Sequence, residues 1–125
     1  MSRTGKIRKF EDLIAWKKSK TLSLKIYSCT KNDGFRSDFA LRDQVRRAVI
    51  SVMSNIAEGF ERYSPKEFQQ YLSIARGSVA EVRSQIHLAK ELKYLSERDA
   101  EEIINLCIEI SKILGGLRRS MNRDK

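Results

Sequence analysis

The chain has 125 residues, of which 41% are hydrophobic and 33% are charged, and its formal net charge is +9. This length fits one domain with one core, and six glycines with one proline leave little room for a loop-rich or all-β fold. The excess of basic over acidic residues favours polyanionic partners such as RNA, DNA or acidic protein.

Residues 1–9 form a basic tail before the first predicted helix. Arg3, Lys6, Arg8 and Lys9 lie there without an acidic residue. A frayed end and an arm that contacts a phosphate backbone both fit this composition, and the frayed end is the simpler interpretation. The N-terminus lacks the apolar run of a signal peptide, and no later segment is apolar enough to span a membrane. We therefore expect a cytoplasmic protein with no membrane partner.

The first helix is predicted over residues 10–31. At 100° per residue its apolar side chains form two groups on different faces. A helix of a single four-helix monomer needs one buried stripe, so the second stripe predicts another packing partner. The same region is rich in lysine, and residues 1–32 hold +7 of the net charge of +9. One group is Phe10, Leu13, Ile14, Trp16, Leu24 and Tyr27, and the other is Ala15, Leu22, Ile26 and Cys29.

A second helix is predicted over residues 38–62. The turn signal Asn32-Asp33-Gly34 precedes it, and Ser37 or Asp38 can cap its first amides. Gly59, near its end, is expected to let the chain turn. A polar row opposite the apolar face is either a solvated surface or a polar seam between subunits, and its short, weakly helix-forming side chains favour the seam. The candidate interface residues in this row are Arg47, Ser51, Asn55 and Glu58.

A third helix is predicted over residues 65–92. Ser64 can cap its first amides, Pro65 suits the first helical position, and Glu67 completes a capping box. Apolar residues then alternate at spacings of four and three, and this heptad seam predicts packing along the neighbouring helices. A ridge of small residues on the back face predicts a helix contact beyond the intramolecular core. The seam is Phe68, Leu72, Ala75, Val79, Val82, Ile86 and Ala89, and the ridge is Ser73, Gly77, Ala80 and Ser84.

The fourth helix is predicted over residues 97–117, with Ser96 as its cap. Arg118 and Arg119 follow, and they suit the negative end of the helix dipole. Four helices with short connections and no β pattern predict an all-α fold, an antiparallel up-down-up-down four-helix bundle over residues 10–119. Residues 120–125 are expected to be a C-terminal tail.

No catalytic, metal or cofactor site can be assembled from the sequence. His87 is the only histidine, and a di-iron bundle needs paired Glu-x-x-His motifs that the chain lacks. Cys29 and Cys107 are expected to be reduced core residues, and with one histidine they cannot form a structural zinc site. Neither a phosphate-binding glycine loop nor a nucleophile–base–acid set is present, so we expect a protein that is not an enzyme.

The stretch QVRRAVISVMSNIAEGFERYSPKEFQQYLSIARGS, residues 44–78, resembles the four-helix-bundle proteins encoded in intervening sequences of bacterial large-subunit (23S) ribosomal RNA genes. The resemblance extends from Lys9 to about Leu117. It implies a homopentamer, a short barrel of bundles, which would account for the second apolar stripe and the small-residue ridge. Its most specific parts are Arg46-Arg47, Ser54-Asn55-Ile56-Ala57-Glu58-Gly59, Ser64-Pro65-Lys66-Glu67-Phe68 and Gly77-Ser78 followed by Glu81.

The family is associated with ribosomal RNA through gene location. It is similar to the accessory protein of diversity-generating retroelements, a basic pentamer that binds nucleic acid and a reverse transcriptase. The first hypothesis is a non-enzymatic oligomer that binds RNA or DNA through phosphate contacts. The alternatives are a protein-interaction scaffold or adaptor for a nucleic-acid enzyme such as a reverse transcriptase, and a passenger protein of a selfish element. The candidate phosphate-binding residues are Lys9, Lys17, Lys18, Lys20, Lys25, Arg46, Arg118 and Arg119.

Overall fold

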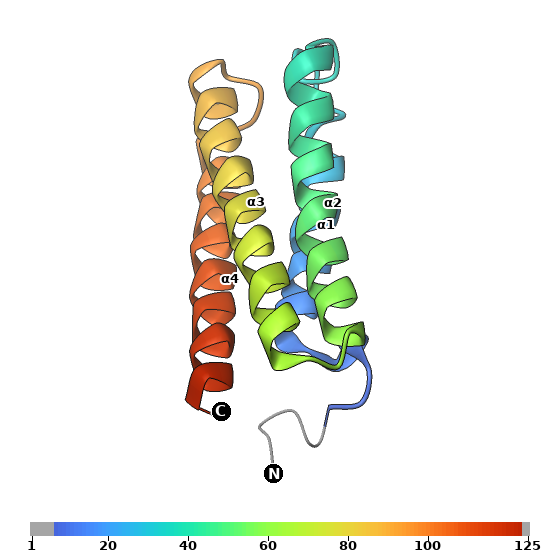
Figure 1. Cartoon of the computed structure of the whole chain (residues 1–125). Helices are drawn as coiled ribbons and strands as arrows, with labels where there is room; N and C mark the ends of the chain where they lie inside the picture. Colours follow the sequence, from blue (N-terminus) through green and yellow to red (C-terminus); the bar gives the residue numbers. More distant parts are fainter. Residues whose placement is uncertain (1–6, 124–125) are drawn as a thin grey trace.

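The computed structural model describes residues 7–123, with side chains up to residue 121. Arg3 and Lys6 of the basic tail lie outside this range. A short 3₁₀ turn, η1 (Phe10–Asp12), precedes α1 (Ile14–Cys29), α2 (Phe39–Glu61), α3 (Pro65–Glu91) and α4 (Glu97–Arg123). The described residues contain no strand. The four helices lie side by side as a bundle (Figure 1), in which α1 and α3 each contact both α2 and α4.

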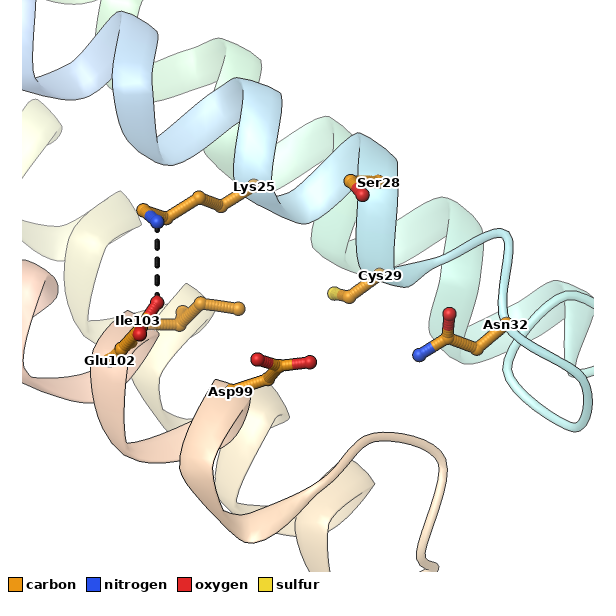
Figure 2. Close-up of a pocket in the computed structure, with 7 residues that line it drawn as sticks. All are labelled: Lys25, Ser28, Cys29, Asn32, Asp99, Glu102 and Ile103. Carbon is orange, nitrogen blue, oxygen red and sulfur yellow. Dashed lines mark hydrogen bonds and ion pairs between the residues drawn. The ribbon is translucent and has the colours of Figure 1, made fainter.

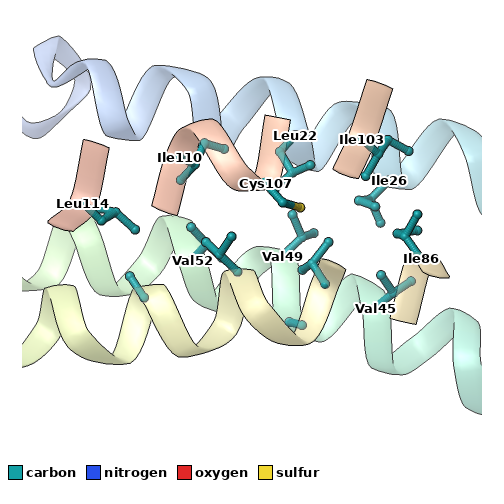
Figure 3. Packing of buried hydrophobic residues seen from close by; sticks show 14 of the residues in the cluster. Leu22, Ile26, Val45, Val49, Val52, Ile86, Ile103, Cys107, Ile110 and Leu114 are labelled. Carbon is teal, nitrogen blue, oxygen red and sulfur yellow. The ribbon is translucent and has the colours of Figure 1, made fainter. Parts of the chain in front are cut away.

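One hydrophobic core lies between the four helices. The heptad seam of α3 is buried along its whole length, from Phe68 to Ala89. It packs against apolar side chains of the other three helices (Figure 3). Burying one Leu or Ile side chain contributes about 1.5–3 kcal/mol, so this layer stabilises the bundle strongly. Other core residues labelled in Figure 3 are Leu22, Ile26, Val45, Val49, Val52, Ile103, Cys107, Ile110 and Leu114.

Polar side chains cap the first turns of α2, α3 and α4. Asp38 Oδ1 accepts a hydrogen bond from the Leu41 amide at 3.1 Å. Ser64 and Ser96 each accept one from the amide three residues later, at 3.3 Å and 3.0 Å. These bonds satisfy amides that have no partner inside the helix. The predicted caps at Ser64 and Ser96 are confirmed, and Asp38 rather than Ser37 caps α2.

The first helix starts later than predicted. Leu13 has extended backbone, with φ −70° and ψ 132°, so the turn at Phe10–Asp12 is separated from α1. The helix therefore begins at Ile14 and ends at Cys29, inside the predicted range of residues 10–31. The expected stripe that began at Phe10 is thus divided between η1 and α1.

The last helix ends later than predicted. Gly115-Gly116 lies inside α4, which continues to Arg123. Met121 is fully buried, so the expected tail at residues 120–125 is helical over its described part and belongs to the core. Each mid-helix glycine costs about 1 kcal/mol relative to alanine, and the burial of Leu114 and Met121 on either side of the pair offsets that cost.

Gly59 is needed for close packing and does not form the turn that the sequence suggests. A Cβ at Gly59 would lie 2.6 Å from Tyr71 Cβ and 2.9 Å from Phe68 Cδ1 of α3. Carbon atoms do not approach so closely without displacement. The turn after α2 is made by Tyr63, whose φ is +56°. Gly59 therefore lets the backbones of α2 and α3 come together next to the turn.

We expect Gly59→Ala to lower the free energy of unfolding by about 1–3 kcal/mol, because the added methyl group forces α2 and α3 apart. The matched change is Gly116→Ala, for which the nearest atom to the new Cβ is Arg119 Nη2 at 3.8 Å. This control is expected to keep or raise the stability by up to about 1 kcal/mol. Urea unfolding followed by circular dichroism measures both, and equal effects of the two changes would contradict the packing argument.

Candidate functional site

The lysines that the sequence assigns to phosphate binding on α1 differ in their surroundings. Lys18 and Lys25 each form an ion pair with a glutamate of α4, at 2.9 Å and 3.4 Å. Figure 2 shows the second pair, in which Lys25 reaches Glu102. Lys17 and Lys20 are exposed, and neither has a carboxylate partner in the described part of the chain. Since an ion pair lowers the local positive potential, the unpaired lysines are the better phosphate ligands.

Arg46 makes contacts within its own chain. Its Cζ lies 4.6 Å from the centroid of the Tyr27 ring, a cation–π distance. Its Nε donates to Thr30 Oγ1 at 2.9 Å, and the buried Thr30 hydroxyl donates in turn to the Ile26 carbonyl at 2.8 Å. The guanidinium thus holds α2 against the C-terminal turn of α1, which gives Arg46 a structural role.

The other candidate cations lie away from Arg46. Lys9 is exposed beside η1, and Arg119 is exposed in the last turns of α4. Arg118 is half-buried, and its Nε has no hydrogen-bond partner among the described atoms. Figure 1 shows η1 and the end of α4 at the same end of the bundle, whereas the first turns of α2 lie at the opposite end. The eight candidates therefore do not form one cluster.

The polar row on α2 is partly bonded within the chain. Ser51 Oγ lies 2.8 Å from Ser78 Oγ of α3, and Asn55 Nδ2 donates to the Ser51 carbonyl at 2.8 Å. Arg47 and Glu58 are exposed, and Glu58 pairs with an arginine four residues later at 3.3 Å. The short polar side chains thus join α2 to α3, and the charged members of the row face solvent in a single chain.

Gly77, in the ridge of small residues on α3, has no packing partner in the described chain. A Cβ at Gly77 would have no other atom within 4 Å. The neighbouring Ile74 and Leu88 are 52% and 51% exposed. Contacts inside the described chain therefore give no reason for a glycine at this position, whereas Ala80 and Ser84 of the ridge line a cavity beside α4. The exposed ridge consists of Ser73, Gly77, Ala80 and Ser84.

We did not predict from the sequence that a group of arginines lies in the groove between α3 and α4. Arg83 and Ser111 help to line a cavity of about 260 Å³. Arg76 Nε donates to Ser111 Oγ at 3.4 Å. Arg76 and Arg83 are seven residues apart on α3, and this spacing places two side chains on one helix face. That spacing is the signal that could have found them.

The two cysteines are buried, and neither is activated. Burial raises the pKa of Cys107 to about 12. Burial, together with the negative charge of Asp99, raises the pKa of Cys29 to about 11. Figure 2 shows Cys29 and Asp99 at a cavity of about 180 Å³ between α1 and α4.

Among the described residues, no three His, Cys, Asp or Glu side chains are placed to hold a metal ion. No described helix is long and apolar enough to cross a bilayer.

Comparison with known families identifies the chain. The family model described as 23S rRNA-intervening sequence protein matches residues 11–116. The chain belongs to this family. The resemblance of the sequence to this family is therefore confirmed.

A solved structure shows the same fold as this 23S rRNA-intervening sequence family member. It is a crystal structure described as that of a protein with unknown function from the S23 ribosomal protein family of Bacteroides thetaiotaomicron. The TM-score is 0.78 and the sequence identity is 23%, over 85% of this chain and 96% of that chain. At that identity the similarity shows the fold alone. A search of curated proteins gives no match.

We expect both thiols of the native protein to react slowly with a colorimetric disulfide reagent at about pH 8. The thiolate is the reactive form, and the raised pKa values keep it scarce at that pH. In denaturant the pKa of each thiol returns to about 8.5, so both should react quickly. The same shifts reduce the stability of the fold as the pH rises above about 8.5, because only the denatured chain then ionises. Fast labelling of the native protein would contradict the burial of these thiols.

Proposed function

We propose that this family member is a non-enzymatic basic protein that binds RNA or DNA through phosphate contacts and acts as a homopentamer of up-down-up-down bundles. The observation that carries the proposal is the set of unpaired lysines on and just after α1. Lys17, Lys20 and Lys31 are exposed, and within the described chain none of them pairs with a carboxylate. Lysines of this kind neutralise phosphates, release counterions and tolerate any base sequence.

Association into an oligomer is supported by surface that the chain leaves uncovered. Ile14 and Leu24 of α1 are 61% and 64% exposed, and they belong to the same apolar group as Phe10 and Trp16. Gly77 is exposed on the α3 ridge, where a close helix from another subunit would justify its cost in helix stability. The number five comes from the family resemblance. Short connections, residues 62–64 and 92–96, support the up-down-up-down order.

Assembly also makes weak phosphate contacts effective. A pair of exposed lysines on one subunit binds a polyanion weakly. When one copy is bound, the other copies are held near the same strand at a high effective concentration. Repetition of the α1 lysines around a ring would thus give useful affinity without base recognition.

The double change Lys17→Gln and Lys20→Gln is expected to weaken binding of duplex, single-stranded and structured RNA alike, because each lysine neutralises backbone phosphate. The slope of log affinity against log salt should decrease in magnitude by about 1.4–1.8 for each subunit that contacts the strand, because each such subunit loses two phosphate contacts. The matched double change Lys18→Gln and Lys25→Gln removes the same charge from the same helix, but these lysines already pair with glutamates, so its effect should be smaller.

Gel-shift titration at two salt concentrations measures both double variants. Equal losses in the two would contradict the assignment to unpaired lysines. If the unchanged protein binds no nucleic acid even at low salt, the proposal fails and the adaptor hypothesis takes its place.

Gly77→Leu is expected to reduce the native mass, because a bulky side chain on the ridge blocks the approach of a second helix. Asn105→Leu on α4 is the control, since residue 105 is also exposed and helical but lies away from the ridge. Light scattering after gel filtration measures both masses. An unchanged mass for Gly77→Leu would contradict a subunit contact at the ridge, and a single-subunit mass for the unchanged protein would contradict the oligomer.

A further inference from the structure

Half of the groove between α3 and α4 carries positive charge without any acidic residue. Residues 68–80 of α3 and 110–121 of α4 contain no Asp or Glu, and they lie side by side next to the chain end marked C in Figure 1. In the other half of the groove, Lys90 and Glu101 pair at 3.0 Å. The four basic residues of the acid-free half are Arg76, Lys112, Arg118 and Arg119.

Two of these guanidinium groups converge on one point of α4. A Cβ at Gly115 would lie 3.4 Å from Arg76 Cζ and 3.4 Å from Arg119 Nη1. Neither arginine has a carboxylate partner in the described part of the chain. Like charges this close repel each other, so an anion bound between them would stabilise the arrangement. The missing side chain at Gly115 leaves room for the two groups to converge.

A cavity continues the site along the groove. Its volume is about 260 Å³, and its lining includes Arg83, His87 and Ser111. The Ser111 hydroxyl, which accepts from Arg76 Nε at 3.4 Å, joins this cavity to the converging arginines. Guanidinium forks and hydroxyl groups are strong donors to the oxygens of a phosphate. The groove therefore offers both charge and directed hydrogen bonds.

The dipole of α4 accounts for only part of this cluster. Arg119 lies near the C-terminal end of α4, where a cation is favourable. Arg76 belongs to α3, yet its side chain bonds to Ser111 of α4 and lies within 3.4 Å of the place where a Cβ at Gly115 would stand. The buried Arg118 Nε also has no hydrogen-bond partner among the described atoms. A helix dipole explains neither observation.

We propose that this groove is an oxyanion site that takes a phosphodiester group of bound nucleic acid. Arg76 and Arg119 bind the phosphate oxygens from opposite sides, and Arg83 and Ser111 extend the site toward the cavity. This inference rests on the proposed function and adds a contact surface separate from the α1 lysines. Arg76 and Arg83 belong to α3, which has no contact with α1 in the described chain, whereas α4 contacts both α1 and α3.

Inorganic phosphate tests the site directly. In ¹H–¹⁵N spectra of the full chain, phosphate should shift the amide signals of Gly115, Gly116 and Ser111 beyond the shifts caused by chloride at equal ionic strength. In the double variant Arg76→Gln and Arg119→Gln these shifts should be lost. No specific shift in the unchanged protein, or the same shift in the double variant, would overturn the inference. A carboxylate of a second copy that occupied the arginines would also appear as no phosphate response.

Binding of labelled RNA, followed by fluorescence anisotropy, links the site to the function. Arg76→Gln with Arg119→Gln should weaken binding roughly tenfold or more, since charge-assisted hydrogen bonds are lost. Arg36→Gln with Arg98→Gln is the control: it removes the same charge from exposed arginines outside the groove, and because each already pairs with a carboxylate its effect should be smaller. Arg76→Lys with Arg119→Lys keeps the charge but loses the fork geometry, so its affinity should lie between the two.

The two measurements separate the possible failures. RNA binding that is equally strong in the groove variant and the control would overturn the groove as a phosphodiester site and leave the α1 proposal standing. A phosphate response at Gly115 without any RNA binding would support the oxyanion site and overturn nucleic-acid binding as its use. Circular dichroism of each variant checks that a lost response does not come from unfolding.

Discussion

The buried heptad seam of α3 is the constraint on which the rest of the molecule depends. Because α3 contacts both α2 and α4, its apolar side chains determine how close both neighbours lie. Gly59 allows α2 to approach at one end of this helix. The same packing leaves Gly77 of the small-residue ridge in solvent and places Arg76 beside α4. The core, the candidate subunit contact and the arginine groove thus follow from the rotation of one helix.

The positive charge that a ligand meets on this protein depends on which basic side chains form ion pairs, as well as on how many basic side chains there are. The side of α1 that faces α4 carries lysines bound to glutamates, whereas Lys17 and Lys20 are exposed and have no carboxylate partner among the described residues. The α3–α4 groove repeats this contrast along its length, with a Lys90–Glu101 pair in one half and converging arginines in the other. The net charge of +9 therefore does not describe the local charge: it is partly neutralised where lysines pair with glutamates and concentrated where arginines converge without acidic residues.

Local signals predicted the helices well, and contacts between helices set the limit of prediction. The Ser64 and Ser96 caps, the α3 seam and the family could be identified because each depends on residues close together in the sequence. The role of Gly59 and the extra turns of α4 depend on the distance to a neighbouring helix, which propensity does not contain. Likewise the lysines of α1 look equivalent in sequence, and only their position opposite glutamates of α4 separates them.

The arginine groove also could not be predicted from local sequence, because it depends on contacts between two helices. Arg76 and Arg119 are 43 positions apart in the chain, and no local motif joins them. Their convergence at Gly115 results from the register between α3 and α4, which is fixed by packing of the whole bundle. A search of the sequence for seven-residue spacing of basic residues would find Arg83 with Arg76, but not the contribution of α4.

The burial of Met121 bears on where this domain can be cut. A chain shortened to residue 119, the bundle limit expected from sequence, would lose a side chain that is completely enclosed. Water would then reach the core at the end of the bundle where α4 ends, next to the arginines of the groove. A shortened version of this protein made for crystallisation should therefore keep Met121, because the last turn of α4 closes this end of the hydrophobic core.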